Sequence, residues 1–294
     1  MKKLFGTGVA LVTPFDESGD INFSALKKVL VHTGKGVDYF VVMGTTGESV
    51  TMSKDEKKKV LAFVQKNNSK NLPIVYGIGG NNTSSVIDEI HDTDLTGVDA
   101  LLSVSPAYNK PSQEGIFRHF SLVADASPLP IILYNVPGRT ASNLTAETML
   151  RLALHKKIIG VKEASGNLEQ CMKVAKEKPA DFMLISGDDL LTLPIYAIGG
   201  VGVISVLANA FPLTFKRMKD FALAGNYVKA QKELFMLVDI NGPMYEEGNP
   251  VGVKQLLHEM GICGPQVRLP LTLASAKLVE KIRSIYRTTK KGQR

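Results

Sequence analysis

Residues 130–164 read PIILYNVPGRTASNLTAETMLRLALHKKIIGVKEA and contain a strand, a helix and a second strand. The runs at 130–136 and 158–164 are rich in Val, Ile and Leu and do not alternate with polar residues. Such runs are typical of parallel strands buried on both faces. Between them, residues 145–156 have helical spacing and begin with Thr145, a common helix N-cap. This stretch therefore predicts one strand–helix–strand unit of a parallel sheet.

The same pattern recurs through the first two-thirds of the chain. Six further apolar runs are predicted as strands, at residues 8–15, 39–44, 73–79, 99–104, 182–189 and 202–206. Charged segments with helical spacing separate them, and one begins with Ser53 and Glu56 at the spacing of a capping box. Eight strand–helix alternations predict an α/β fold, a closed (β/α)8 TIM barrel. A doubly wound sheet is the alternative, and the lack of a glycine-rich dinucleotide fingerprint disfavours it.

The strand pattern ends before the C-terminal quarter of the chain. Residues 215–286 read mostly as helices, broken at NGPMYEEGNP (241–250) and GICGPQVRLP (261–270). We therefore assign residues 1–214 to the catalytic barrel and residues 215–294 to a C-terminal helical extension packed on it.

Composition excludes several classes of protein. The chain has 294 residues, of which 44% are hydrophobic and 21% charged, which is ordinary for a globular protein. It contains no uncharged apolar run of the roughly 18 residues that a transmembrane helix needs. Two cysteines without metal-ligand spacing fit a reducing compartment, so we expect a cytoplasmic protein. The net charge of +7 is spread over several helices, and no motif supports a nucleic-acid partner.

Lys162 is the most informative polar residue at a predicted strand end. Active sites of (β/α)8 barrels lie at the C-terminal ends of the strands. Lys162 stands near the end of a buried run, where desolvation disfavours the ammonium form. A neutral amine is the nucleophile that forms an imine with a ketone. The alternative is a structural lysine paired with Glu163 or Asp188.

Three other strand-end groups complement this amine. Tyr134 could move the protons that imine formation requires. The hydroxyls and backbone N–H groups of Thr45 and Thr46 could hold a carboxylate, and Arg139 could pair with a second one. Each has an ordinary structural interpretation when taken alone: a strand-end tyrosine, a turn and a surface arginine. Together with Lys162 they predict a class I aldolase-type lyase acting on a 2-oxo acid.

The motifs at these positions resemble those of one family. GTTGES (44–49), YNVPGRT (134–140) and GVKEASGN (160–167) occur in this order, together with LVTPF, PAYNKPSQEG, SGDD, GVISV and NPVGVKQLLHEMG. Over nearly its whole length the chain resembles the dihydrodipicolinate synthase and N-acetylneuraminate lyase family. The resemblance implies a Schiff-base condensation of pyruvate with L-aspartate-4-semialdehyde, in lysine biosynthesis through diaminopimelate, without a metal or organic cofactor.

The resemblance also implies roles for individual residues. Lys162 would form the imine with pyruvate, and Tyr134 would be the proton donor and acceptor. Thr45 and Tyr108 would complete a hydroxyl relay, with Tyr108 contributed by the neighbouring subunit of a homodimer or of a homotetramer built as a dimer of dimers. The residues implied to bind substrates are Thr46, Arg139, Gly187 and Ile204.

The chain departs from the family pattern around the inter-subunit site through which lysine inhibits some members. Ala107 stands where the family often has a first tyrosine. Of the other positions of that site, Asn81 and Ser49 remain, and the altered ones are Lys54, Lys57 and Ser85. Two lysine side chains would repel a cationic ligand, and Ser85 removes a carboxylate that could pair with it. We therefore expect that free lysine does not inhibit the protein.

Three rival functions remain open. A sugar-acid lyase of the same family, such as a 2-keto-3-deoxy-sugar-acid aldolase or N-acetylneuraminate lyase, would share Lys162, but Arg139 and Tyr108 argue against it. Pyridoxal phosphate chemistry also uses a lysine imine, and Gly199-Gly200 is only a weak candidate for its phosphate loop. A non-catalytic barrel is expected to lack Lys162, Tyr134 or Thr45, and all three are present.

Overall fold

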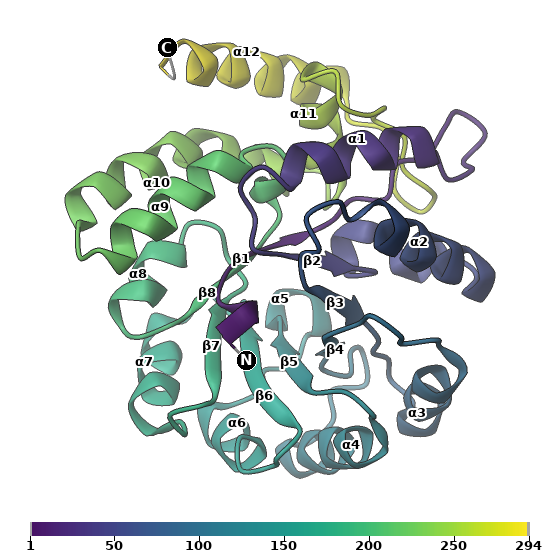
Figure 1. The fold of residues 1–294 in the computed structure, drawn as a ribbon, viewed down its shortest axis with the longest axis vertical. Coiled ribbons are helices and arrows are strands. Elements are labelled where there is room, and N and C mark those ends of the chain that lie inside the picture. The colour runs from purple at the N-terminus through teal and green to yellow at the C-terminus, as the bar shows by residue number, and fades with distance from the viewer. Residues whose placement is uncertain (1, 293–294) are drawn as a thin grey trace. The chain divides into compact units, whose positions relative to one another are not determined.

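The computed structural model describes residues 2–292, and its strands form a closed parallel barrel in the order of the chain (Figure 1). Seven of the eight predicted apolar runs contain a whole strand, and β1 begins two residues before its predicted run at 8–15 and ends at Ala10. The strands are β1 (Gly6–Ala10), β2 (Tyr39–Val42), β3 (Ile74–Gly77), β4 (Ala100–Val104), β5 (Ile131–Asn135), β6 (Ile158–Glu163), β7 (Met183–Ser186) and β8 (Gly202–Ser205). The (β/α)8 barrel expected from the sequence is therefore confirmed.

Helices alternate with the strands. They are α1 (Phe23–Thr33), α2 (Lys54–Asn67), α3 (Thr83–Asp92), α4 (Gln113–Ala126), α5 (Pro137–Thr140), α6 (Ala146–Leu152), α7 (Leu168–Glu177), α8 (Thr192–Ala197) and α9 (Pro212–Leu223). The predicted capping box is present, since Ser53 and Glu56 each accept a hydrogen bond from the other's backbone N–H. The helix expected over residues 145–156 is shorter than predicted, because α6 ends at Leu152 and the chain turns before β6.

Within the described residues the chain forms two compact units, residues 2–6 with 73–204 and residues 7–72 with 205–292. In the first unit, β3 to β8 pair in parallel register, with Tyr134 of β5 opposite Lys162 of β6. The core of this unit is made of fully buried aliphatic side chains, such as Ile131 and Val161, whose relative exposure is 0%.

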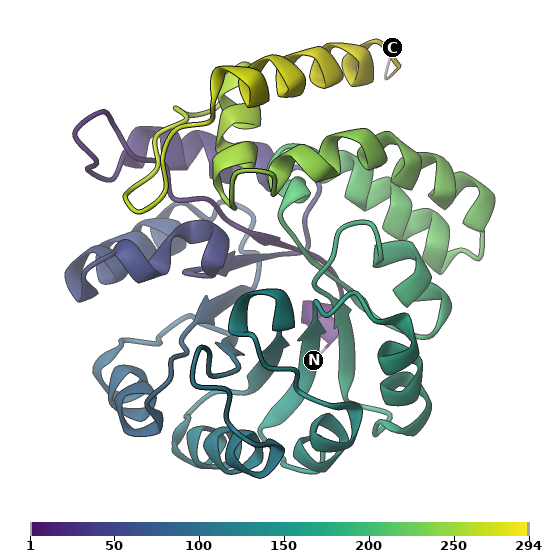
Figure 2. The same cartoon turned by 180° about the vertical axis from the view of Figure 1, so that it is seen from behind.

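The second unit contains β2, most of β1 and the C-terminal helices. After α9 come α10 (Tyr227–Asn241), α11 (Val251–Glu259) and α12 (Ala276–Gly292), and α9 and α10 lie side by side in both views (Figure 2). The two predicted helix breaks are confirmed, because helices end at Asn241 and Glu259. The assignment of residues 215–294 as a separate extension stays a prediction. No helix among residues 2–292 combines the length and apolarity needed to cross a membrane.

Candidate active site

Lys162 and Tyr134 form the centre of the candidate site in the first unit. They are register partners on β6 and β5, so their side chains point to the same side of the barrel wall. The Lys162 Nζ lies 4.0 Å from the centroid of the Tyr134 ring. Both residues are buried, with relative exposures of 6% and 8%. The structure therefore brings together the predicted nucleophile and the predicted proton carrier.

The ion pair with Glu163 or Asp188 that would make Lys162 a structural residue is absent among residues 2–292. Side chains alternate along a strand, so Glu163 points to the other side of β6. Its carboxylate accepts hydrogen bonds from Asn135 Nδ2 at 3.0 Å, from Gln170 Nε2 at 2.9 Å and from the Ser165 backbone N–H at 2.6 Å. Among residues 2–292, Lys162 has neither a hydrogen bond nor an ion pair.

A polar cluster around Glu163 fixes the ends of β5 and β6. Asn135 Nδ2 also donates to Asn143 Oδ1 at 2.8 Å, and Asn143 Nδ2 donates to Gln170 Oε1 at 2.8 Å. The backbone N–H of Leu144 donates to Asn135 Oδ1 at 2.9 Å. Buried polar groups that satisfy one another in this way hold a local structure rigid. Because Asn135 and Glu163 directly follow Tyr134 and Lys162, the cluster holds both site residues in place. The sequence analysis missed this cluster, although strand alternation would have placed Glu163 away from Lys162.

Arg139 lies on α5, and the loop that contains Tyr108 is hydrogen-bonded to the end of this helix. Arg139 is exposed on α5, and its guanidinium makes no ion pair with any described residue. The Tyr108 backbone N–H donates to the Thr140 carbonyl, next to Arg139, at 3.2 Å. Tyr108 has φ of 70° and a relative exposure of 90%. A bulky residue in this left-handed conformation is strained, and its side chain projects into solvent rather than packing on its own chain.

Gly187 and Ile204 follow or lie on neighbouring strands of the same unit. The Gly187 backbone N–H donates to the Glu163 carbonyl at 2.7 Å. A Cβ atom at Gly187 would lie 2.6 Å from the Ala164 Cβ, so no larger residue fits without movement of the backbone. Ile204 is buried on β8, with 1% of its surface exposed. Gly187 therefore allows close approach of the chain beside the end of β6.

Thr45 and Thr46 belong to the second unit, in the short helix η2 (Thr45–Gly47) that follows β2. Thr45 is exposed and Thr46 is buried. The Thr13 hydroxyl donates to the Gly47 carbonyl at 2.8 Å, and Asn249 Nδ2 donates to the Thr46 hydroxyl oxygen at 3.1 Å. These contacts hold the turn that the sequence predicts as a carboxylate site.

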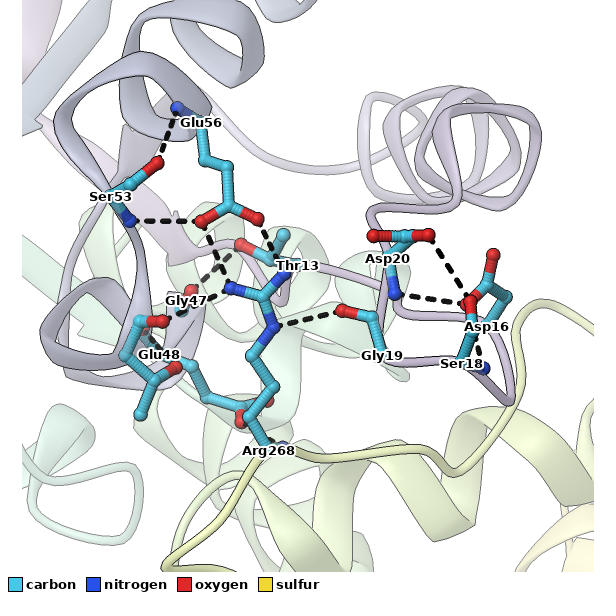
Figure 3. A network of polar contacts seen from close by, with 11 residues as sticks. Thr13, Asp16, Ser18, Gly19, Asp20, Gly47, Glu48, Ser53, Glu56 and Arg268 are labelled. Carbon is cyan, nitrogen blue, oxygen red and sulfur yellow. Dashed lines mark hydrogen bonds and ion pairs between the residues drawn. The ribbon is translucent and has the colours of Figure 1, made fainter.

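The residue after this turn, Glu48, belongs to a larger polar network (Figure 3). Its carboxylate accepts from Lys254 Nζ at 2.5 Å and from the Arg268 backbone N–H at 2.9 Å. The Arg268 guanidinium donates to the Gly19 and Thr51 carbonyls and pairs with Glu56. This hydrogen-bonded guanidinium holds the pKa of Glu56 at about 2. The sequence analysis did not identify this support, because its members lie about 200 residues apart.

In the part of the chain that the structure describes, no three His, Cys, Asp or Glu side chains are placed to hold a metal ion. The first unit supplies an amine, a phenol and a guanidinium, and the turn in the second unit supplies two threonine hydroxyls.

Comparisons with known proteins show the family to which the chain belongs. The sequence matches the Dihydrodipicolinate synthetase family over residues 3–288. The chain belongs to this family. A relative from Cytophaga hutchinsonii, named 4-hydroxy-tetrahydrodipicolinate synthase, is 48% identical over 97% of each chain. A protein of the same name from Flavobacterium psychrophilum is 47% identical over 96% of this chain and 97% of the relative.

Solved structures of the dihydrodipicolinate synthetase family have the same fold. The enzyme from Aquifex aeolicus has a TM-score of 0.93 and 36% identity, with 98% of each chain covered. The Acinetobacter baumannii enzyme, solved in complex with pyruvate, has a TM-score of 0.94 and 34% identity, covering 98% of this chain and 99% of that chain. Family membership confirms the lyase class and the lysine-biosynthetic activity that the sequence motifs implied.

Proposed function

We propose that this protein condenses pyruvate with L-aspartate-4-semialdehyde through an imine on Lys162. The observation that carries this proposal is the buried Lys162 amine, which has no counter-ion among the described residues and lies 4.0 Å from the Tyr134 ring centroid. Family membership and the pyruvate complex of the Acinetobacter baumannii relative support pyruvate as the oxo acid.

The proposed reaction begins with attack of the Lys162 amine on C2 of pyruvate. Tyr134 gives a proton to the hydroxyl of the carbinolamine, water leaves, and the protonated imine forms. Loss of a proton from C3 then gives an enamine, whose carbon attacks the aldehyde and forms the new carbon–carbon bond. The amino group of the second substrate finally displaces Lys162 and closes the ring. The protonated imine on Lys162 accepts the electron pair that the C3–H bond leaves behind, so the proposal includes neither a metal nor an organic cofactor.

The other site residues are proposed to move protons or to bind carboxylates. Thr45 and Tyr108 take part in the proton relay with Tyr134. Thr46 and the backbone near Ile204 bind the pyruvate carboxylate, while Gly187 leaves space beside the imine. Arg139 binds the carboxylate of the aldehyde, which is supported by a guanidinium without an ion pair among residues 2–292.

We propose that the protein assembles as a homodimer or as a homotetramer built from two such dimers, in the cytoplasm. The support is Tyr108, which is 90% exposed and held in a strained conformation. A large aromatic side chain in that position fits a role in the site of a neighbouring subunit.

Insensitivity to free lysine is also part of the proposal. Lys54 and Lys57 bring positive charge to a region where inhibited relatives are implied to bind a cationic amino acid, and Ser85 brings no carboxylate. We expect activity to be unchanged at millimolar lysine. Half-inhibition at submillimolar lysine would contradict this expectation.

Borohydride trapping with pyruvate, followed by peptide mass mapping, tests the imine. The reduced adduct is expected on Lys162, and an adduct on another lysine, or none, would overturn the mechanism. Trapping without pyruvate is the control.

Arg139→Ala tests the choice of aldehyde. Loss of hydrogen bonds to a charged group is expected to raise the half-saturating concentration of aspartate semialdehyde about 10- to 100-fold while pyruvate trapping stays unchanged. Arg118→Ala, which removes another exposed arginine, is the matched control. Equal losses in both assays would make Arg139 structural. Faster turnover of pyruvate with glyceraldehyde than with aspartate semialdehyde would favour the sugar-acid lyase function instead.

A further inference from the structure

The hydroxyl group of Thr46 is held by a residue from the far end of the chain. Asn249 precedes α11, and its Nδ2 donates to Thr46 Oγ1 at 3.1 Å across 203 positions of sequence. Asn249 and Thr46 have relative exposures of 8% and 2%. This bond is therefore shielded from water, and its geometry is set by the protein alone.

The direction of this hydrogen bond decides what the hydroxyl can do. A threonine hydroxyl has one proton to donate and two lone pairs that can accept. Asn249 occupies one lone pair, and no acceptor for the hydroxyl proton is found among residues 2–292. The proton thus stays available for a carboxylate of a ligand. An acceptor in place of the Asn249 amide would use that proton within the protein.

Asn249 is an unfavourable choice if it serves packing alone. Its Oδ1 is buried and has no hydrogen-bond partner among the described residues. A buried oxygen without a donor lowers stability, and an apolar side chain of similar size, such as leucine, avoids that loss. A buried polar atom without a hydrogen-bond partner is expected where the residue has a functional role that offsets the loss of stability.

Two further contacts hold the residues that follow Thr46, and one of them comes from the same segment as Asn249. Five residues after Asn249, Lys254 of α11 binds the Glu48 carboxylate. Thr13 holds the carbonyl of Gly47. Thr46 and Gly47 of the turn, and Glu48 directly after it, are therefore each fixed by a contact from another segment.

We propose that Asn249 is a positioning residue, which presents the Thr46 hydroxyl as a hydrogen-bond donor to the carboxylate of the 2-oxo acid. This inference rests on the proposed function, because it takes Thr46 as a ligand of pyruvate. It assigns to the region after the barrel strands a part in substrate binding.

The test measures the pyruvate concentration that gives half-maximal borohydride trapping in the full-length protein, together with the KM for each substrate. Asn249→Asp, which replaces the donor by a charged acceptor, is expected to raise that concentration about 10- to 100-fold. Asn249→Leu is expected to raise it about 5- to 10-fold, with an unchanged or higher thermal midpoint. The KM for aspartate semialdehyde is expected to stay within about two-fold of the wild-type value for both variants, because Thr46 and Asn249 are proposed to bind pyruvate and not the aldehyde.

A double-mutant cycle shows whether Asn249 acts through Thr46. Thr46→Val removes the hydroxyl, so Asn249→Leu is expected to have no further effect on pyruvate saturation in that background. An equal effect in both backgrounds overturns the inference. Asn226→Ala is the matched control, because Asn226 caps α10 in the same unit, and it should leave pyruvate saturation unchanged.

The outcomes separate this inference from the proposed function. If Thr46→Val weakens pyruvate trapping and Asn249→Asp does not, only the inference fails. If Thr46→Val leaves pyruvate trapping unchanged, the proposed role of Thr46 fails and the inference fails with it. Loss of trapping at Lys162 itself overturns the mechanism as a whole. Asn249→Ala provides the same comparison if the leucine variant does not fold.

Discussion

Lys162 on β6 and Lys254 on α11 are both buried, with relative exposures of 6% and 0%, but their neighbours differ. Lys254 Nζ donates to Glu48 Oε1 at 2.5 Å and to the Gln266 carbonyl at 2.8 Å. It also lies 4.2 Å from the centroid of the Phe15 ring. Lys162 has an aromatic ring at a similar distance and, within residues 2–292, no anionic partner.

The difference shows that burial alone does not identify a reactive lysine. Burial lowers the pKa of Lys254, while the Glu48 carboxylate acts in the opposite direction. In a buried ion pair of this kind the ammonium group is held by the carboxylate and is not available as a nucleophile. The amine of Lys162 is not engaged in such a contact, and the carboxylate beside it in sequence is bound by other groups.

The largest expected effect is that of Lys162→Met. Removal of a covalent nucleophile is expected to lower kcat on the order of 10⁶-fold. The fold should be unaffected, because the amine has no ion pair to lose. Steady-state kinetics and thermal melting measure the two effects separately. A drop in thermal midpoint as large as that of a Lys254 variant would remove the contrast between the two lysines.

Tyr134→Phe keeps the aromatic ring beside Lys162 and removes only its hydroxyl. Loss of a group that transfers protons in the reaction is expected to lower kcat about 10²- to 10⁴-fold. The thermal midpoint should change little, since the ring still fills its place. Nearly normal kcat in this variant would show that the ring, and not the hydroxyl, is what Lys162 requires.

Lys254→Met is expected to lower stability rather than chemistry. Breaking a buried ion pair leaves Glu48 charged and unpaired, at a cost of about 3–5 kcal/mol in the free energy of unfolding. The double variant Lys254→Met with Glu48→Leu should recover most of this loss, because an apolar pair of similar volume replaces the ion pair. Urea denaturation measures both. A double variant as unstable as the single one would contradict this account.

The smallest expected effect concerns Glu56, whose pKa is lowered from 4.5 to about 2 by Arg268. A carboxyl with a lowered pKa stabilises the folded state fully above its ordinary value, and this stabilisation is lost as the pH falls from about 4.5 through about 2. Glu56→Gln can keep the capping box and is expected to remove about 1–3 kcal/mol of this acid-dependent stability. Urea denaturation as a function of pH measures the change, with the exposed Glu17→Gln as control. An unaltered pH dependence would count against the Arg268 contact.

Much of the fold could be predicted because its signals are local. Strands such as Ile131–Asn135 and Ile158–Glu163 are buried at every position, and they are apolar until their C-terminal ends. The capping box at Ser53 uses residues three positions apart. The proximity of Lys162 and Tyr134 followed from neighbouring parallel strands, once the barrel was assigned.

The parts of the site that the sequence did not predict depend on long-range contacts. Asn249 and Lys254 contact residues about 200 positions away, and no periodic pattern links the two segments. The direction of the side chains also decides which groups can pair, because Glu163 follows Lys162 in sequence but points to the opposite side of the strand. These relations depend on tertiary structure and are not set by local residue preference.

The long-range contacts made by the segment from Asn249 to Arg268 have a practical consequence for engineering. Asn249, Lys254 and Arg268 each contact the stretch from Thr46 to Glu56. A chain break, inserted domain or circular permutation within this segment would separate the threonine turn from some of its supports, however exposed the chosen position is. Biosensor or fusion designs on this scaffold should therefore leave residues 249–268 continuous.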